Sequence, residues 1–345
     1  MKPNANAIVL EAPGKFQAMP APSPEPPKAG FALVQIHRVG VCGTDLHAFA
    51  GKQPFFSYPR ILGHELGVEI AEIPPNDLGL KPGDLCAVEP YLNCGRCVAC
   101  RRGKPNCCVK IQVMGVHADG GMRPYLSVPI SKLHRSPGGL SLDQLALVET
   151  LGIGAHAVHR ARIEPGEWAL VLGTGPIGLS VIPFAQAAGA KVIAADVNPR
   201  RLDFCRRSFG VSATLDPSAP DFLDALRGLT DDELPTAVFD ATGNPSSMMA
   251  SFNFPAHGGR LVFVGLFLGD VTFNDPNFHR RELTLLGSRN ALPEDFGRIL
   301  GLLASGQVDT APWITHRAPL DAVPDEFPRW TNPESNVLKA MIDVG

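Results

Sequence analysis

Four cysteines lie within fifteen residues, at the spacing Cys-x2-Cys-x2-Cys-x7-Cys. They are Cys94, Cys97, Cys100 and Cys108. Thiolates at this spacing can converge on one tetrahedral zinc ion. The alternative, a pair of disulfides, is typical of small secreted domains, and we expect no secretory leader on this chain of 345 residues. A zinc ion with four protein ligands has no open position, so this site is predicted to shape a loop and to perform no chemistry.

A second group of metal-ligand residue types lies upstream. Cys42 stands in the stretch Cys-Gly-Thr-Asp-Leu-His, and His64 and Glu65 follow in Gly-His-Glu. A thiolate, an imidazole and a carboxylate form the mixed ligand set of a catalytic zinc, which keeps one position open for water or substrate. A lone histidine is more often structural, but the three residue types together favour a metal site.

Residues 173–178 form a Gly-x-Gly-x-x-Gly sequence, which follows a predicted strand and opens a predicted helix, as in a dinucleotide site. Its members are Gly173, Thr174, Gly175, Pro176, Ile177 and Gly178. Gly173 permits a tight turn, Gly175 lets the backbone approach a pyrophosphate, and Gly178 lets the helix pack closely on the strand. The first N–H groups of the helix are then available to the phosphates.

Asp196 ends the next predicted strand, at the position where a carboxylate accepts hydrogen bonds from the adenosine ribose. A carboxylate there would repel a 2′-phosphate, so the sequence favours NAD over NADP. Arg200 and Arg201 are the opposing indication, because their guanidinium groups could bind such a phosphate.

The first 150 residues are predicted to form the elements that position the mixed metal site. Short β-rich runs alternate with Pro and Gly, and a helical pattern occurs only at residues 42–50. The runs are residues 7–10, 31–39, 67–73, 85–88 and 125–128. Residues 19–27 carry five prolines and are expected to be an extended surface connection. This pattern predicts an antiparallel, barrel-like domain.

From about residue 140, helical segments alternate with buried strands, which predicts a doubly wound α/β sheet. Its strands are expected at residues 168–172, 191–195, 237–240, 260–264 and 283–286. Pro183 should kink or shorten the helix that opens at Pro176, because it removes a backbone donor. A helix is expected from residue 293 to about 305, and strands at 313–317 and 337–343.

Composition excludes several classes of protein. Hydrophobic residues make up 45% of the chain, charged residues 19%, and the net charge is −3, so we expect a soluble chain of two domains. There is no basic stripe for nucleic acid and no apolar run long enough for a membrane span. The N-terminus, residues 1–4, precedes no apolar segment, which predicts a cytoplasmic location. The remaining Cys86, Cys107 and Cys205 are expected to be small buried or partly buried hydrophobic residues.

Together these motifs resemble the zinc-dependent medium-chain dehydrogenase/reductase family, which includes alcohol, sorbitol and threonine dehydrogenases. The resemblance covers nearly the whole chain. It implies a GroES-like β-barrel catalytic domain formed by residues 1–150 and 291–345, with a structural zinc lobe at 90–110. A Rossmann domain, a doubly wound parallel sheet at residues 151–290, is inserted between the two segments. Two zinc ions per chain and NAD are the implied cofactors.

The resemblance also implies roles for individual residues at the mixed site. Cys42 and His64 match the zinc ligands of the family, and Glu149 stands where the alcohol dehydrogenases have a further cysteine. We expect Glu65 to be a ligand, with Glu149 on the metal or on its water. Asp45 matches a carboxylate that orients the zinc-bound imidazole, and the alternative is an N-cap of the following helix.

In the family the zinc ion activates a substrate hydroxyl, and hydride passes from its carbon to the nicotinamide. Thr44 and His47 match the relay that takes the released proton to solvent, since histidine changes charge near neutral pH. The alternative for His47 is a surface histidine. Thr242 and Gly265 lie in segments that contact the cofactor in the family. Lys339 resembles a residue near the catalytic site, although a solvated lysine is also consistent.

Arg123 and Arg289 are the residues that bear on the substrate. A guanidinium binds a carboxylate through paired N–H donors, so the sequence suggests a polyhydroxy acid oxidised at a secondary hydroxyl. In the alternative, Arg289 binds the NAD pyrophosphate and Arg123 lies at the surface or at an interface. Neutral polyol, sugar or threonine-type dehydrogenases, and a non-catalytic dinucleotide-binding zinc protein, are the competing functions. The family further implies a homodimer or homotetramer.

Overall fold

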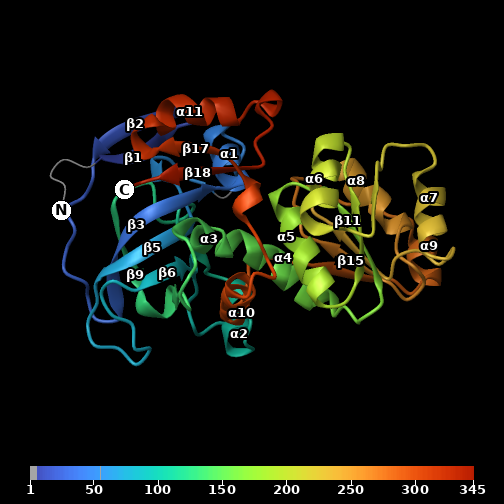
Figure 1. The fold of residues 1–345 in the computed structure, drawn as a ribbon, viewed down its shortest axis with the longest axis horizontal. Coiled ribbons are helices and arrows are strands. Elements are labelled where there is room, and N and C mark those ends of the chain that lie inside the picture. The colour runs from blue at the N-terminus through green and yellow to red at the C-terminus, as the bar shows by residue number, and fades with distance from the viewer. Residues whose placement is uncertain (1–5, 55) are drawn as a thin grey trace. The chain divides into compact units, whose positions relative to one another are not determined.

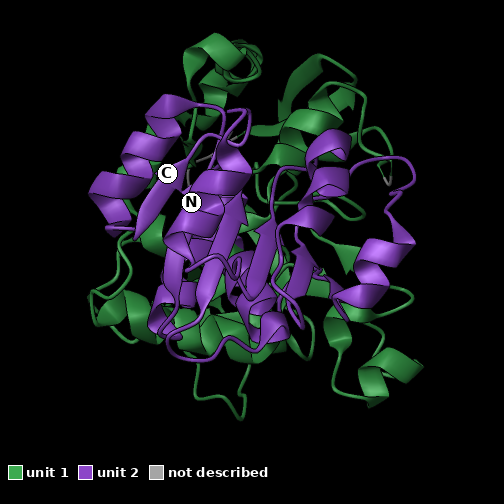
Figure 2. Ribbon diagram, turned by 90° about the vertical axis from the view of Figure 1, so that its right-hand side faces the viewer, with its two compact units in different colours: residues 1–149, 292–345 green, residues 150–291 purple. Residues whose placement is uncertain are grey.

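The computed structural model describes residues 6–54 and 56–345, and the chain divides into two compact units (Figure 2). The first unit combines Met1–Glu149 with Leu292–Gly345, and the second is Thr150–Ala291. The first unit is therefore built from both ends of the chain. The N-terminal residues 1–4, on which the predicted location partly rests, lie outside the described residues.

A seven-stranded sheet organises the first unit (Figure 1). Its path runs β10-β6-β5-β3-β18-β17, and β9 also pairs with β3. The bounds are β3 Phe31–Val41, β5 Glu65–Glu72, β6 Leu85–Val88, β9 Tyr125–Pro129, β10 Leu133–Arg135, β17 Ile314–Pro319 and β18 Lys339–Asp343. All pairs are antiparallel except β17 with β18. Because β18 pairs with β3, the last strand of the chain lies beside the strand that leads into Cys42.

Smaller elements complete this unit. A three-stranded sheet runs β2-β1-β4, and a two-stranded sheet pairs β7 with β8. The strands are β1 Asn6–Ala12, β2 Lys15–Pro20, β4 Arg60–Ile61, β7 Tyr91–Leu92 and β8 Gln112–Val113. The helices are α1 Gly43–Phe49, α2 Val98–Arg101, α3 Leu142–Ala146, α10 Pro293–Ala304 and α11 Val323–Trp330. The helix α4 (Val148–Ala161) begins at the end of the first segment of this unit, which ends at Glu149.

The second unit is a six-stranded parallel sheet in the order β13-β12-β11-β14-β15-β16, with helices flanking it (Figure 2). The strands are β11 Trp168–Leu172, β12 Lys191–Ala195, β13 Ala213–Leu215, β14 Ala237–Asp240, β15 Arg260–Phe263 and β16 Thr284–Gly287. The helices are α5 Pro176–Ala187, α6 Pro199–Phe209, α7 Phe222–Leu229, α8 Pro245–Ala250 and α9 Asp275–Arg280. With the strands numbered in chain order from β11, this is the 3-2-1-4-5-6 order of dinucleotide-binding sheets. The predicted doubly wound sheet is confirmed.

Pro183 lies inside α5 and does not end it, because the helix is buried along most of its length and packing compensates for the missing hydrogen bond. That Pro183 kinks or shortens this helix stays a prediction. The short strands β2 and β13 were not predicted. One local prediction was wrong: α2 is a helix in the stretch where only residues 42–50 were expected to be helical, whereas α3 falls after residue 140, where helices were expected. Among the described residues, no helix is long and apolar enough to cross a membrane.

Candidate metal centres and cofactor site

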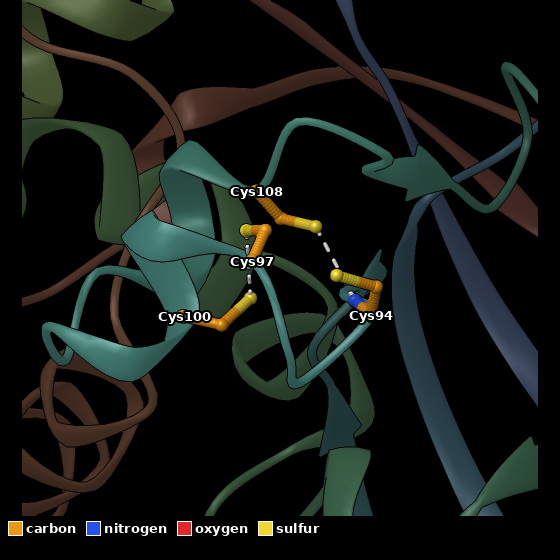
Figure 3. A group of neighbouring side chains, drawn as sticks. All are labelled: Cys94, Cys97, Cys100 and Cys108. Carbon is orange, nitrogen blue, oxygen red and sulfur yellow. Dashed lines mark hydrogen bonds between the residues drawn. The ribbon is translucent and has the colours of Figure 1, made fainter.

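The four-cysteine lobe brings its sulfur atoms together without a disulfide (Figure 3). The four Sγ atoms all lie within 4.8 Å of one another, and those of Cys97 and Cys100 are 3.5 Å apart. Four sulfurs at about 2.3 Å from a tetrahedral zinc ion would be about 3.8 Å apart. Backbone N–H groups of Cys94 and Lys110 point at the Cys108 sulfur, as they would at a thiolate. The lobe therefore fits a zinc ion.

The other cysteines divide into two kinds. Cys86 and Cys205 are fully buried, and burial raises the pKa of each thiol to about 12. Cys107 is exposed, so the prediction that it is buried or partly buried was wrong. It ends the short turn Pro105–Cys107, and the neighbouring Cys108 is the residue that turns inward to the lobe.

The mixed pocket forms where β3 meets β5. Cys42 follows β3, His64 precedes β5 and Glu65 begins it, and their ligand atoms lie within 4.8 Å of one another. His64 and Glu65 are 4% and 1% exposed. Gly40 of β3 pairs with Glu65, and a Cβ at Gly40 would lie 2.0 Å from Glu65 Oε2. The absence of a side chain at Gly40 therefore makes room for the Glu65 carboxylate.

Asp45 lies beside the His64 imidazole. Its Oδ1 atom is 3.7 Å from His64 Nδ1, which is too long for a hydrogen bond, and Nε2 is the nitrogen that does not face the Asp45 carboxylate. Its Oδ2 atom accepts a hydrogen bond from Cys42 N at 2.9 Å, and because Cys42 is the N-cap of α1, Asp45 stands at the third helical position and is not an N-cap. Burial opposes a charge on His64, but Asp45 and Cys42 together raise its pKa well above the usual value. Asp45 Oδ1 and His64 Nδ1 have no hydrogen-bond partner in the described structure, and a shortening of the distance between them would pair both.

Lys339 is buried at 2% exposure and pairs with Glu65. Its Nζ atom donates to both carboxylate oxygens, at 2.7 and 2.8 Å, and to the Val41 carbonyl at 3.1 Å. Burial disfavours the ammonium charge, but Glu65 outweighs it and the pKa of Lys339 is raised. The alternative of a solvated lysine was wrong.

Glu149 lies in the first turn of α4, at 5% exposure, and adjoins the pocket. Its Oε1 atom accepts a hydrogen bond from the Tyr91 hydroxyl at 2.5 Å. Burial, together with the nearby Glu65, raises the pKa of this carboxyl group. It is not one of the three groups whose ligand atoms lie within 4.8 Å of one another. Sequence reasoning missed Tyr91, which lies 58 residues from Glu149 and carries no local motif.

The two residues of the predicted proton relay both lie on α1. Thr44 is half-buried at the start of the helix, and His47 is exposed near its end. An exposed imidazole exchanges protons with solvent, as the end of a relay requires and as a surface histidine also does.

A cavity of about 650 Å³ in the second unit receives most of the predicted cofactor residues. Those that line it are Gly173, Gly175, Pro176, Asp196, Arg201 and Thr242. Gly173 has φ +81°, and a Cβ on Gly178 would lie 1.8 Å from the Gly173 carbonyl oxygen, so this turn requires both glycines. The predicted residues that do not line the cavity are Ile177, Gly178, Gly265 and Arg289.

Asp196 is held rigidly at the end of β12. Its Oδ2 atom accepts hydrogen bonds from Thr174 N at 2.7 Å and Thr174 Oγ1 at 3.0 Å, and Oδ1 accepts from Asn198 N at 2.8 Å. Arg201 Nη1 lies 3.6 Å from the same carboxylate. The acidic residue that favours NAD and one arginine that could bind a 2′-phosphate thus lie side by side.

Arg123 lies in a different part of the first unit. Its Nε atom donates to the Gly120 carbonyl at 3.1 Å, and it lines a cavity of about 360 Å³ beside the proline-rich segment that contains Pro22 and Pro26. None of the described residues that line this cavity belongs to the mixed pocket. Arg289, on the second unit, is exposed.

Two family descriptions match this chain. Residues 28–138 match the alcohol dehydrogenase GroES-like domain, and residues 176–305 match the zinc-binding dehydrogenase domain. The chain belongs to the zinc-dependent medium-chain dehydrogenase/reductase family. This assignment confirms the resemblance inferred from the sequence and agrees with the two metal centres and the parallel sheet.

Individual relatives span almost the whole chain. L-galactonate-5-dehydrogenase of Escherichia coli (strain K12) is 46% identical over 90% of this chain and 91% of that protein. The 2-dehydro-3-deoxy-L-galactonate 5-dehydrogenase of Pseudoalteromonas atlantica is 31% identical over 92% of each. A crystal structure of an alcohol dehydrogenase from E. coli CFT073, complexed with NADH, has a TM-score of 0.91 and 26% identity and covers 99% of each chain.

Proposed function

We propose that this enzyme oxidises a secondary hydroxyl of a sugar acid to a keto group and transfers the hydride to NAD. The observation that carries the proposal is the 46% identity to an L-galactonate-5-dehydrogenase, in a chain whose mixed pocket holds Cys42, His64 and two buried glutamates. The reaction consumes the alcohol and NAD⁺ and yields the ketone, NADH and one proton.

The pocket residues would hold and orient a zinc ion. Such an ion supplies Lewis acidity that lowers the pKa of a substrate hydroxyl. Cys42 and His64 would be ligands, and Asp45, whose Oδ1 atom lies 3.7 Å from His64 Nδ1, would orient the ring so that Nε2 faces the ion. Lys339 neutralises Glu65, so the buried pocket carries one negative charge less than its acidic residues alone would give it.

The released proton requires a route to solvent. We propose that Thr44 begins this route and that exposed His47 ends it. In support, both residues lie on α1, the helix that starts directly after Cys42. If His47 carries the proton, replacing it by Asn should lower turnover and shift the pH profile of turnover. If His47 is a surface histidine without a role in proton transfer, both should stay unchanged.

NAD is the proposed cofactor because Asp196 is fixed at the end of β12 and lines the cavity. The test compares kcat/KM with NAD and with NADP for the native chain and for Asp196→Ser. The variant should lose its preference for NAD, since Arg201 would then face a 2′-phosphate without the competing carboxylate. A native preference for NADP would refute the assignment.

The substrate is tested by NADH absorbance on a panel that contains L-galactonate, other aldonates, neutral polyols, threonine and simple alcohols. Each substrate is assayed with the zinc-loaded protein, with and without a chelator. Turnover that is confined to aldonates and abolished by the chelator is the expected result. Turnover of neutral polyols alone would place the chain with the sorbitol-type enzymes instead.

The two arginines are tested in the same assay. If Arg289 or Arg123 binds the substrate carboxylate, replacing it by Met should lower kcat/KM for aldonates and leave that for neutral polyols unchanged. If Arg289 instead binds the NAD pyrophosphate, the KM for NAD should rise with every substrate. Because Arg123 lies in a separate cavity, we expect its variant to behave as the native enzyme does.

We further propose that the enzyme works in the cytoplasm as a homodimer or homotetramer. In support of the location, all eight cysteines are free thiols, as a reducing compartment favours. In support of association, β16 ends the strand order of its sheet, and Leu285 on it is 40% exposed. The mass of the native protein, measured by light scattering, tests the second point.

A further inference from the structure

Tyr91 is a buried residue beside the mixed pocket. It is 2% exposed, and its hydroxyl donates to Glu149 Oε1 at 2.5 Å. Hydrogen bonds of this length between a hydroxyl and a carboxylate are charge-assisted and among the stronger ones in proteins. Because the carboxylate oxygen of Glu149 can only accept, the Tyr91 hydroxyl is the donor in this contact.

The surroundings of Tyr91 hold its ring in place. The ring packs edge-on against Phe296, with centroids 6.4 Å apart, and His134 stacks on Phe296 at 4.7 Å. Behind it, the buried Glu89 accepts hydrogen bonds from Lys132 and from His134. The backbone is fixed as well, because Tyr91 pairs with Val113 across β7 and β8. This packing restricts the hydroxyl to one position.

The two glutamates of the pocket are held in different ways. Both oxygens of Glu65 accept hydrogen bonds from the Lys339 ammonium. Glu149 is held through Oε1 alone, and within the described residues Oε2 accepts no hydrogen bond. Glu149 is therefore the pocket carboxylate with an oxygen that no described side chain occupies.

We propose that Tyr91 is a positioning residue of the metal pocket, whose hydroxyl holds Glu149 by one oxygen and leaves the other free to reach the metal or its water. This inference rests on the proposed zinc chemistry, and it assigns to Tyr91 no contact with the substrate. It predicts that loss of the hydroxyl weakens the pocket while the ring, and with it the fold, stays in place.

The test is Tyr91→Phe in the full-length protein loaded with metal. We expect the affinity of the mixed pocket for zinc to fall about 10- to 100-fold in competition with a chelator, with the lobe unaffected. With cobalt in place of zinc, the visible absorption of the pocket ion should shift. The control is Tyr58→Phe, which removes a hydroxyl that donates to the Ala48 carbonyl at 2.5 Å in the same unit. This control should leave affinity and spectrum unchanged.

A second variant separates positioning from a general loss of stability. In a Glu149→Ala background, Tyr91→Phe should have little further effect on zinc affinity, because the acceptor through which Tyr91 acts is gone. Additive effects, or native affinity and spectrum in Tyr91→Phe alone, would overturn the proposal. These readouts do not require turnover, so failure to oxidise any sugar acid would refute the proposed function and leave this inference intact.

Discussion

The two candidate metal centres collect their residues in opposite ways. The lobe takes four cysteines from fifteen consecutive residues, and their side chains are partly exposed apart from the buried Cys108. The mixed pocket joins Cys42, His64 and Glu65 to residues from α4 and from the last strand, and its carboxylates are buried. The lobe is formed by one loop, whereas the mixed pocket is formed by residues from distant elements of the first unit.

The difference lies in how negative charge is stabilised. Three of the four cysteines of the lobe are partly exposed, so backbone N–H groups and solvent can stabilise their thiolates. A buried carboxylate has no such solvent, and its charge requires a partner within the fold. Glu65 has Lys339, Glu149 has Tyr91, and Asp45 has the Cys42 N–H group.

The largest effect is expected from Lys339→Met. The buried charge of Glu65 would lose its partner, so the free energy of unfolding should fall by about 3–5 kcal/mol. Urea unfolding of the zinc-loaded protein measures the loss. The matched control is Lys15→Met: Lys15 pairs with Glu11 at the same 2.7 Å, but the two side chains are 67% and 31% exposed. That pair should contribute less than about 1 kcal/mol. If both variants lost the same free energy of unfolding, burial would not be the cause of the larger effect expected at Lys339.

Removing one ligand from each centre should separate their roles. Cys42→Ser should reduce the zinc content from two ions to one per chain and lower turnover about 1000-fold, which corresponds to about 4 kcal/mol. Cys100→Ser should also leave one zinc ion but should act mainly on the thermal stability of the lobe. Elemental analysis, circular dichroism melting and the NADH assay distinguish the two. If Cys100→Ser lost turnover as completely as Cys42→Ser, the assignment of a structural role to the lobe and a catalytic role to the mixed pocket would be wrong.

Gly40→Ala tests the space that Glu65 requires. The new Cβ would lie 2.0 Å from Glu65 Oε2, so the carboxylate must move, at a cost of about 1–3 kcal/mol. We expect weaker zinc binding in the pocket and an unchanged lobe. Gly43→Ala is the matched control: it lies one residue after Cys42, and a Cβ there meets no atom within 4 Å. Native zinc affinity in Gly40→Ala would show that Glu65 can leave its place freely.

The smallest effect concerns thiol reactivity. Backbone N–H groups of Cys100 and Val109 lower the pKa of Cys97 to about 6. Burial raises the pKa values of Cys86 and Cys205 to about 12. In metal-free protein at pH 7, iodoacetamide should therefore modify Cys97 rapidly and leave Cys86 and Cys205 intact. Because the thiolate is lost as the pH falls through 6, the rate at Cys97 should drop about tenfold between pH 7 and pH 5. Peptide mass spectrometry measures both.

Zinc loading provides the control for this experiment. A bound metal should protect Cys97 but not the exposed Cys107, which is outside the group of four. Protection of Cys107 by zinc would mean that it, rather than Cys108, completes the lobe.

The features that could be predicted from the sequence depend on residues that are close together along the chain. The lobe could be predicted because its four cysteines lie within fifteen residues. The glycine-rich turn could be predicted because φ +81° at Gly173 and the close approach at Gly178 require glycine. The apolar strands β11, β12 and β14 matched their predicted bounds because a parallel sheet buries both faces of each strand.

The partners of the residues in the mixed pocket could not be predicted from the sequence and follow from the tertiary structure. Lys339 lies 274 residues from Glu65, and Tyr91 lies 58 from Glu149, so no local pattern joins either pair. The same holds for Arg123, which the fold places beside the proline-rich segment, and for Pro183, which packing accommodates within α5. The physical reason is that burial makes charges interact strongly, and burial depends on which distant segments the sheet brings together.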